Sequence, residues 1–264
     1  MSLITLTTDF GFSDPYVGAM KGVIATIAPE ARILDLCHGV APFDLLDGAY
    51  TLAQAYAFYP PGTIHVVVVD PGVGTPRRPI LARVGRHLFI APDNGVLSMV
   101  YDRETDITVR HMTARHYFLP EVSDTFHGRD IFAPAAAWVA KGVDPDNLGE
   151  PITDFIRFAV PKPRRAEDGL HGIVLKTDRF GNLITNFSRR DLPGLQAPAE
   201  IELMVGNATV ATMRADFEEP APGRLFALWG SAGYLEISAH RASAARTAGA
   251  ERGAEVVLRK AAGG

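Results

Sequence analysis

The chain has 264 residues, enough for one large domain or two smaller ones, and its 47% hydrophobic and 21% charged residues are typical of a globular protein. The net charge of -4 argues against a nucleic-acid partner, because proteins that bind nucleic acids usually present a basic face. The chain has a single cysteine, Cys37, which excludes an intrachain disulfide. It has neither an apolar run of membrane-spanning length nor a secretion signal, so the sequence predicts a cytoplasmic protein without a membrane partner.

Strand and helix signals alternate over the first half of the chain. Leu3–Thr7 is a β-rich run, and Asp14 followed by Pro15 predicts the start of a helix. The run Thr63–Val69 is continuously apolar and rich in valine, as in a strand buried on both faces of a parallel sheet. The remaining elements expected in this half are a strand over 32–36 and helices over 45–56, capped by Asp44, and 129–140. This alternation predicts βαβ units and an open α/β sheet.

The pattern changes after about residue 160. A polar, proline-broken stretch over 161–168 suits a linker, and 242–253 is either a short helix or a loop. Short strand-like runs separated by turn residues are expected at 172–176, 183–187, 201–204, 225–228, 234–237 and 256–258. The sequence therefore predicts an N-terminal α/β domain over 1–162 and a C-terminal β domain, a barrel or a sandwich, over 169–264.

The segment Asp70–Arg78 follows the buried valine strand directly. Ligands of open α/β sheets bind beyond the carboxyl ends of the strands, so Asp70 is placed where a functional carboxylate is expected. Arg77 lies seven residues further on and could fold back against Asp70. The alternative is a tight turn whose aspartate caps the loop and whose arginines are solvated.

Asp9 and His127 are two further candidates. Asp9 ends the first predicted strand, where a carboxylate often binds ribose hydroxyls. No G-x-G-x-x-G or P-loop occurs, so a nucleoside is easier to accommodate than a nucleotide. His127 precedes a predicted helix, whose dipole favours the neutral imidazole that can accept or relay a proton. The alternatives are a turn carboxylate for Asp9 and a capping or buried histidine for His127.

Two polar turns in the second half complete the candidates. Asp178 and Asn182 belong to an Asp-x-x-Gly-Asn sequence, which is either a hairpin turn or a set of partners for a polar ligand. Ser231 and Glu236 lie in a segment of small residues that is either a hairpin or a ligand-contacting turn. Neither a metal-binding pattern nor a G-x-S-x-G elbow occurs, so no metal site and no Ser-His-Asp hydrolase is predicted.

Taken together, these segments resemble the S-adenosylmethionine (SAM) hydrolases that form adenosine, also called SAM hydroxide adenosyltransferases. That family is related to the SAM-dependent fluorinase and chlorinase, which use a halide on the same substrate. The matching pieces run in order over nearly the whole chain: Thr8–Gly11, Cys37–Val40, Asp70–Thr75, Ala91–Gly95, Phe126–Asp130, Phe180–Asn182 and Ser231–Glu236. The resemblance implies an N-terminal α/β domain, a C-terminal β-barrel-like domain and a homotrimer with active sites at its subunit interfaces.

The resemblance also implies roles for single residues. The set of residues beside the attacking water in the hydrolases is matched here by Asp70, Arg77 and His127. The halide enzymes carry a tyrosine at the aspartate position and a serine at the histidine position, so the residues of this chain favour water over halide as the nucleophile. Ala232 stands where the halide enzymes have an arginine, which leaves the contact to the methionine carboxylate open. The implied substrate-binding residues are Asp9 at the ribose, Phe43 as an apolar wall, Asp178 and Ser231 at the methionine end, Asn182 at the adenine or amino-acid part, and Glu236.

The expected reaction is hydrolysis of SAM to adenosine and L-methionine by attack of water on the ribose 5′ carbon, with no cofactor. The sulfonium already makes methionine a good neutral leaving group, so the site has to position a nucleophile in line with the breaking bond. Either Asp70 or His127 could take the proton from the water. The alternatives are a halide-using SAM transferase of the same fold, a nucleoside-binding protein without catalysis, and a plain structural trimer.

Overall fold

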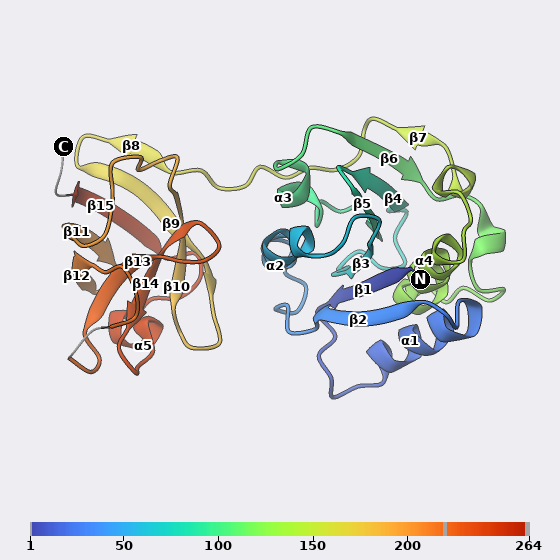
Figure 1. Cartoon of the computed structure of the whole chain (residues 1–264), viewed down its shortest axis with the longest axis horizontal. Coiled ribbons are helices and arrows are strands. Elements are labelled where there is room, and N and C mark those ends of the chain that lie inside the picture. The colour runs from blue at the N-terminus through green and yellow to red at the C-terminus, as the bar shows by residue number, and fades with distance from the viewer. Residues whose placement is uncertain (1, 219–220, 262–264) are drawn as a thin grey trace. The chain divides into compact units, whose positions relative to one another are not determined.

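The computed structural model describes residues 2–218 and 221–261 and divides into two compact units, Met1–Val160 and Pro161–Gly264 (Figure 1). The first unit is α/β and the second is a β-barrel with one short helix, so the predicted fold class is confirmed. Over the described part of the chain, every helix is too short or too polar to cross a membrane.

A seven-stranded mixed sheet in the order β2-β1-β3-β5-β4-β6-β7 forms the centre of the N-terminal unit. The first four strands of that order pair parallel with one another, and each later neighbouring pair is antiparallel. The parallel group is β2 (Arg32–Cys37), β1 (Leu3–Thr8), β3 (Ile64–Val68) and β5 (His87–Pro92), followed by β4 (Pro79–Val84), β6 (Ile107–His111) and β7 (Pro151–Ile152). The sequence predicted β1, β2 and β3, and every residue of β3 is buried, as expected of a strand covered on both faces.

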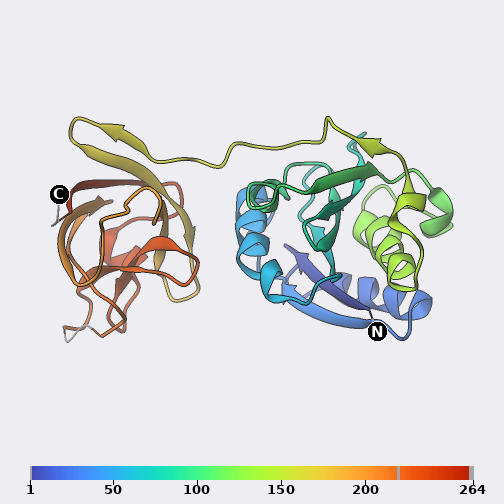
Figure 2. The same ribbon diagram turned by 45° about the horizontal axis from the view of Figure 1, so that its top comes forward.

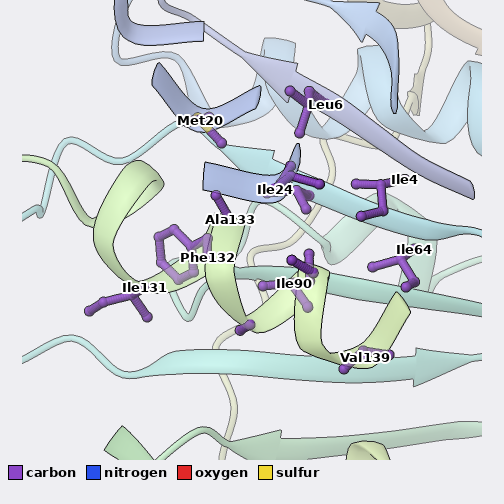
Figure 3. Close-up of a cluster of buried hydrophobic side chains, with 14 of the residues drawn as sticks. Ile4, Leu6, Met20, Ile24, Ile64, Ile90, Ile131, Phe132, Ala133 and Val139 are labelled. Carbon is purple, nitrogen blue, oxygen red and sulfur yellow. The ribbon is translucent and has the colours of Figure 1, made fainter. Parts of the chain in front are cut away.

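Helices cover both faces of this sheet. Helices α1 (Tyr16–Ile27) and α4 (Ala133–Ala140) lie side by side on one face (Figure 2). Their apolar side chains, among them Met20 and Val139, meet Ile4 and Leu6 of β1 in one hydrophobic core (Figure 3). The other face carries α2 (Leu45–Ala55) and α3 (Ser98–Tyr101). Three short 3-10 helices complete the unit: Tyr56–Phe58, Arg115–Tyr117 and Pro145–Leu148.

The predicted helix starts are right at α2 and wrong at α1. Asp47 donates its backbone N–H to the Asp44 side chain at 2.9 Å, so Asp44 caps α2 as predicted. Helix α1 instead has Pro15 as its capping residue and no side-chain cap, and the Asp14 carboxylate accepts a bond from Ser13.

The predicted helix over 129–140 is two consecutive segments, a π-helical turn at Gly128–Phe132 followed by α4. Pro134 has no N–H to donate to the carbonyl of Asp130 four residues earlier. That carbonyl accepts from Leu119 N at 2.9 Å instead, which ties the preceding loop to the π-helical turn.

A closed barrel makes up the C-terminal unit, because β9 pairs with both β10 and β15 and the order runs β10-β14-β13-β12-β11-β15-β9. Its short helix α5 (Ala244–Ala248) falls within the stretch predicted as helix or loop. The barrel strands are β9 (Gly169–Thr177), β10 (Leu183–Ser188), β11 (Ala199–Val205), β12 (Ala208–Met213), β13 (Leu225–Trp229), β14 (Tyr234–Ala239) and β15 (Glu255–Ala261).

Part of the predicted linker is a strand. β8 (Arg164–Ala166) pairs with β9 in a tight hairpin through Gly169, whose φ is +146°. A Cβ at Gly169 would lie 2.5 Å from the carbonyl oxygen of Leu258. The hairpin therefore packs on β15 at a position where only glycine fits, although its residues are polar and proline-rich.

A buried histidine pair, His65 and His87, lies in the N-terminal unit. Because side chains alternate along a strand, His65 lies on the face of the sheet opposite its neighbours Ile64 and Val66, which belong to the core with α1 and α4. His65 Nδ1 is 2.7 Å from Thr5 Oγ1, and His65 Nε2 is 3.4 Å from His87 Nδ1. Burial, and then the neighbouring His87, lower the pKa of His65 to about 3. His65 is therefore neutral in the folded protein over the whole physiological range.

We expect His65 to make the fold acid-sensitive. A histidine of the unfolded chain titrates near pH 6.5, so between about pH 6.5 and 3 the unfolded state binds a proton that the folded state excludes. The free energy of unfolding should fall by on the order of 2 kcal/mol from pH 7.5 to pH 5. His65→Asn should remove most of this difference in urea unfolding, whereas His171→Asn should not, because Glu255 and Asp168 raise the pKa of the partly buried His171. An equal pH dependence in wild type and His65→Asn would contradict the assignment.

Candidate active site

The loop 69–78 carries two of the predicted catalytic side chains. It leaves the carboxyl end of β3 and returns into β4, and it has to pass the end of β5, which lies between these strands. Gly74 has φ +79°, and a Cβ there would lie 2.7 Å from the carbonyl oxygen of Asp124. The glycine thus permits a close approach between this loop and the segment that leads to His127.

Asp70, Arg77 and His127 meet at this place. Arg77 Nε donates to Asp70 Oδ1 and Oδ2, at 3.0 Å each, and Nη2 donates to Oδ2 at 2.5 Å. The same Nη2 lies 2.6 Å from His127 Nδ1. The Arg77 and Asp70 side chains are only 8% and 5% exposed, and the guanidinium stacks on the Phe132 ring at 5.3 Å. Arg77 is therefore a buried bridge between the carboxylate and the imidazole.

The Arg77 contact decides which His127 nitrogen carries the proton. A guanidinium only donates hydrogen bonds, so His127 Nδ1 accepts and the proton of the neutral ring is on Nε2. Burial, followed by the positive charge of Arg77, lowers the pKa of His127. The neutral state of His127 is therefore favoured, as predicted, and burial and Arg77 both contribute to it.

A cavity of about 270 Å³ opens beside Asp70 and His127. Asp9 reaches it from the end of β1, and its Oδ2 accepts from Phe43 N at 2.8 Å, while Phe43 adopts φ +64°. The lining residues are Asp9, Phe10, Tyr16, Pro42, Phe43, Val68, Asp70, Val73, Thr125, Phe126, His127 and Gly128. Four predicted site residues, Asp9, Phe43, Asp70 and His127, thus share one cavity.

The sequence analysis assigned no role to three other aromatic side chains of this cavity. Phe10, Tyr16 and Phe126 contact one another with ring centroids 5.3 to 5.9 Å apart. Phe10 and Phe126 lie within the motifs that carry the resemblance, so those motifs could have indicated them. Tyr16 begins α1, and an aromatic residue there has the same pattern as a core residue.

The predicted residues of the C-terminal unit lie in two turns of its barrel and on β14. Asp178 Oδ1 accepts from the Asn182 backbone N–H and Oδ2 from Asn182 Nδ2, both at 2.9 Å, in the hairpin between β9 and β10. Burial, with a contribution from the Asp178 charge, raises the pKa of Glu236 on β14. A Cβ at Gly230 would lie 2.7 Å from Glu236 Oε2, so this carboxylate packs against the turn that bears the exposed Ser231.

Comparison with known proteins places the whole chain in one family. Residues 4–149 match the SAM hydroxide adenosyltransferase N-terminal domain and residues 172–257 its C-terminal domain. A protein named (R)-S-adenosyl-L-methionine hydrolase from Thermus thermophilus is 38% identical, covering 98% of this chain and 100% of its own length. One of the same name from Salinispora tropica is 38% identical over 95% of both chains.

Similarity extends to solved structures and to halide enzymes. The crystal structure of an uncharacterized conserved protein from Thermotoga maritima has a TM-score of 0.92 and 33% identity, covering 97% of this chain and 100% of that chain. Proteins named fluorinase also match, at 25 to 29% identity. From the two matched domains and the relatives above 30% identity, the chain belongs to the SAM hydroxide adenosyltransferase family.

Proposed function

We propose that the chain hydrolyses SAM to adenosine and L-methionine, with water attacking the ribose 5′ carbon. The observation that carries the proposal is the contact of Asp70, Arg77 and His127 at the wall of a cavity of about 270 Å³. The relatives named as SAM hydrolases support it, since they match over nearly the full length of both chains.

Hydrogen-bond capacity favours Asp70 over His127 as the proton acceptor. His127 Nδ1 is occupied by Arg77, and its Nε2 carries the ring proton, so neither nitrogen is available as a base. Asp70 Oδ1 accepts one bond from Arg77 and Oδ2 accepts two, which leaves capacity on Oδ1. We infer that water donates to Asp70 Oδ1 and accepts from His127 Nε2–H. As its oxygen bonds to the 5′ carbon, the carbon–sulfur pair goes to sulfur and the proton to Asp70.

The rest of the cavity suits the nucleoside part of SAM. Asp9 lies where it can accept from ribose hydroxyls, and Phe43 with the aromatic cluster offers flat apolar surfaces for the ribose and adenine. For the methionine part we propose Asp178, Asn182, Ser231 and Glu236. The two carboxylates match the ammonium group of methionine in charge.

We further propose that the protein is a cytoplasmic homotrimer in which neighbouring subunits complete each site. Phe43, beside Asp9, is 73% exposed, and Phe180, beside Asp178, is 78% exposed. Large apolar side chains exposed beside binding residues favour surfaces that a partner covers. A single cysteine is compatible with a reducing compartment.

Oxygen-labelled water tests the proposed reaction. In H₂¹⁸O, we expect one labelled oxygen in every adenosine released, detected by mass spectrometry, and one methionine per adenosine. Parallel reactions with chloride or fluoride should give no 5′-halogenated adenosine. Unlabelled adenosine, a halogenated product, or SAM binding without methionine release would each contradict the proposal in favour of a different nucleophile or a non-catalytic binder.

A further inference from the structure

The segment Asp93-Asn94 follows β5 and contacts both ends of the loop 69–78. Because β5 lies between β3 and β4 in the sheet, one end of that loop lies on each side of β5. The β4–β5 ladder ends at the pair Pro79 and Pro92, so Arg78 and Asp93 face each other just beyond it. Asp93 is 2% exposed. The cavity of about 270 Å³ is lined by neither Asp93 nor Asn94.

Asn94 holds the end of the loop that leads to Asp70. Its Nδ2 donates to the carbonyl of Val69, the residue before Asp70, at 2.9 Å. Its Oδ1 accepts from Val96 N at 3.1 Å, which fixes the orientation of the amide. The Asn94 side chain therefore joins the end of β5 to the end of β3.

Asp93 holds the end of the loop that follows Arg77. Its backbone N–H donates to the carbonyl of Arg78 at 2.8 Å. Its Oδ2 accepts from Arg78 Nε and Nη2 at 2.9 and 2.7 Å, and its Oδ1 accepts from Ile156 N at 2.8 Å. This backbone and side-chain pairing fixes the residue adjacent to Arg77.

We propose that Asp93 and Asn94 are positioning residues, which hold the two ends of the loop 69–78 so that Asp70 and Arg77 meet His127 in the geometry that turnover needs. The proposal rests on the proposed hydrolase function for its kinetic consequence. Displacing a reacting group by about 1 Å can cost about 10² in rate. Loss of either anchor should therefore lower kcat while substrate binding changes little.

Two near-isosteric substitutions test the anchors. Asn94→Asp keeps the acceptor for Val96 N but sets a carboxylate against the Val69 carbonyl, and Asp93→Asn removes the charge that pairs with Arg78. We expect kcat to fall by about 10- to 100-fold, with the Kd for adenosine within about 3-fold of wild type. The NMR titration of His127 should move to higher pH, because a loosened Arg77 no longer disfavours the imidazolium as strongly.

Two control variants separate positioning from general weakening of the fold. Ser98→Ala also removes two buried hydrogen bonds of this region, to the Gly95 carbonyl and from Phe158 N, but none to the loop. Asp154→Asn removes the charge of the other carboxylate that pairs with Arg78, and the Asp154 side chain is 77% exposed. Both should keep wild-type kcat and the wild-type His127 titration.

The two readouts also separate this proposal from the proposed function. Folded anchor variants with unchanged kcat and unchanged His127 titration would overturn the positioning role. If the wild type does not hydrolyse SAM at all, the hydrolase proposal fails, and the His127 titration of the same four variants still decides whether Asp93 and Asn94 hold the loop.

Discussion

Replacing Asp70 by asparagine is expected to lower kcat for SAM hydrolysis by about 10²–10⁴-fold, the usual effect of removing a group that takes a proton. Asparagine is nearly isosteric and still accepts bonds from Arg77, so KM should change much less than kcat. The proton released as water attacks the 5′ carbon would have no carboxylate to receive it. The measurement is adenosine release at saturating SAM, with far-UV circular dichroism to verify that the variant is folded.

His127→Gln separates the two candidate acceptors. Glutamine can still accept from Arg77 and donate to water, so its loss should be smaller than that of Asp70→Asn. Asp102→Asn, at the exposed end of α3, is the matched carboxylate control and should keep full activity. A large loss in His127→Gln with a near wild-type rate in Asp70→Asn would reverse the assigned roles.

Arg77→Met should affect both stability and turnover. Removing one partner of a buried ion pair typically costs about 3–5 kcal/mol, because the remaining charge stays buried without its counterion. Asp70 is that remaining charge here, at 5% side-chain exposure. We therefore expect the free energy of unfolding in urea at pH 7.5 to fall by about 3 kcal/mol. Hydrolysis should be lost to at least the extent seen in Asp70→Asn, since Asp70 and His127 are no longer held together.

An exposed arginine provides the comparison. Arg83 is 52% exposed and lies 4.0 Å from Asp146, so Arg83→Met should change the free energy of unfolding by less than about 1 kcal/mol. Equal stability losses in the two variants would mean that the bridge between Asp70 and His127 contributes no more than a surface pair. The NMR titration of His127 should move to higher pH in Arg77→Met alone, because Arg77 is one of the groups that lower its pKa.

Two of the features predicted correctly from the sequence have a clear local pattern. The valine run of β3 and the cap at Asp44 need no distant partner to be recognised. Strand β5 was not predicted; it begins at His87, a polar residue that is buried in contact with His65 and Tyr56. Polarity likewise concealed β8, which is ordered by its hairpin with β9 rather than by an apolar face.

The residues of the site also differ in how far the local sequence indicates them. The strand end identified Asp70, and the seven-residue spacing made a contact with Arg77 plausible. The bridge from Arg77 to His127 spans fifty residues and depends on the close approach at Gly74, which no local pattern encodes. The role proposed for Asp93 and Asn94 emerges only when the strand order is known.

The passage of one loop over the end of β5 has an evolutionary consequence. The two ends of the loop continue from β3 and into β4, which flank β5 in the sheet. Exchanging the side chain at position 70 therefore alters the reactive group without altering the strand order. We therefore expect members of this fold to change the nucleophile that they use by point substitution. A single residue inserted within the loop would instead displace Asp70 and Arg77 relative to each other and to His127.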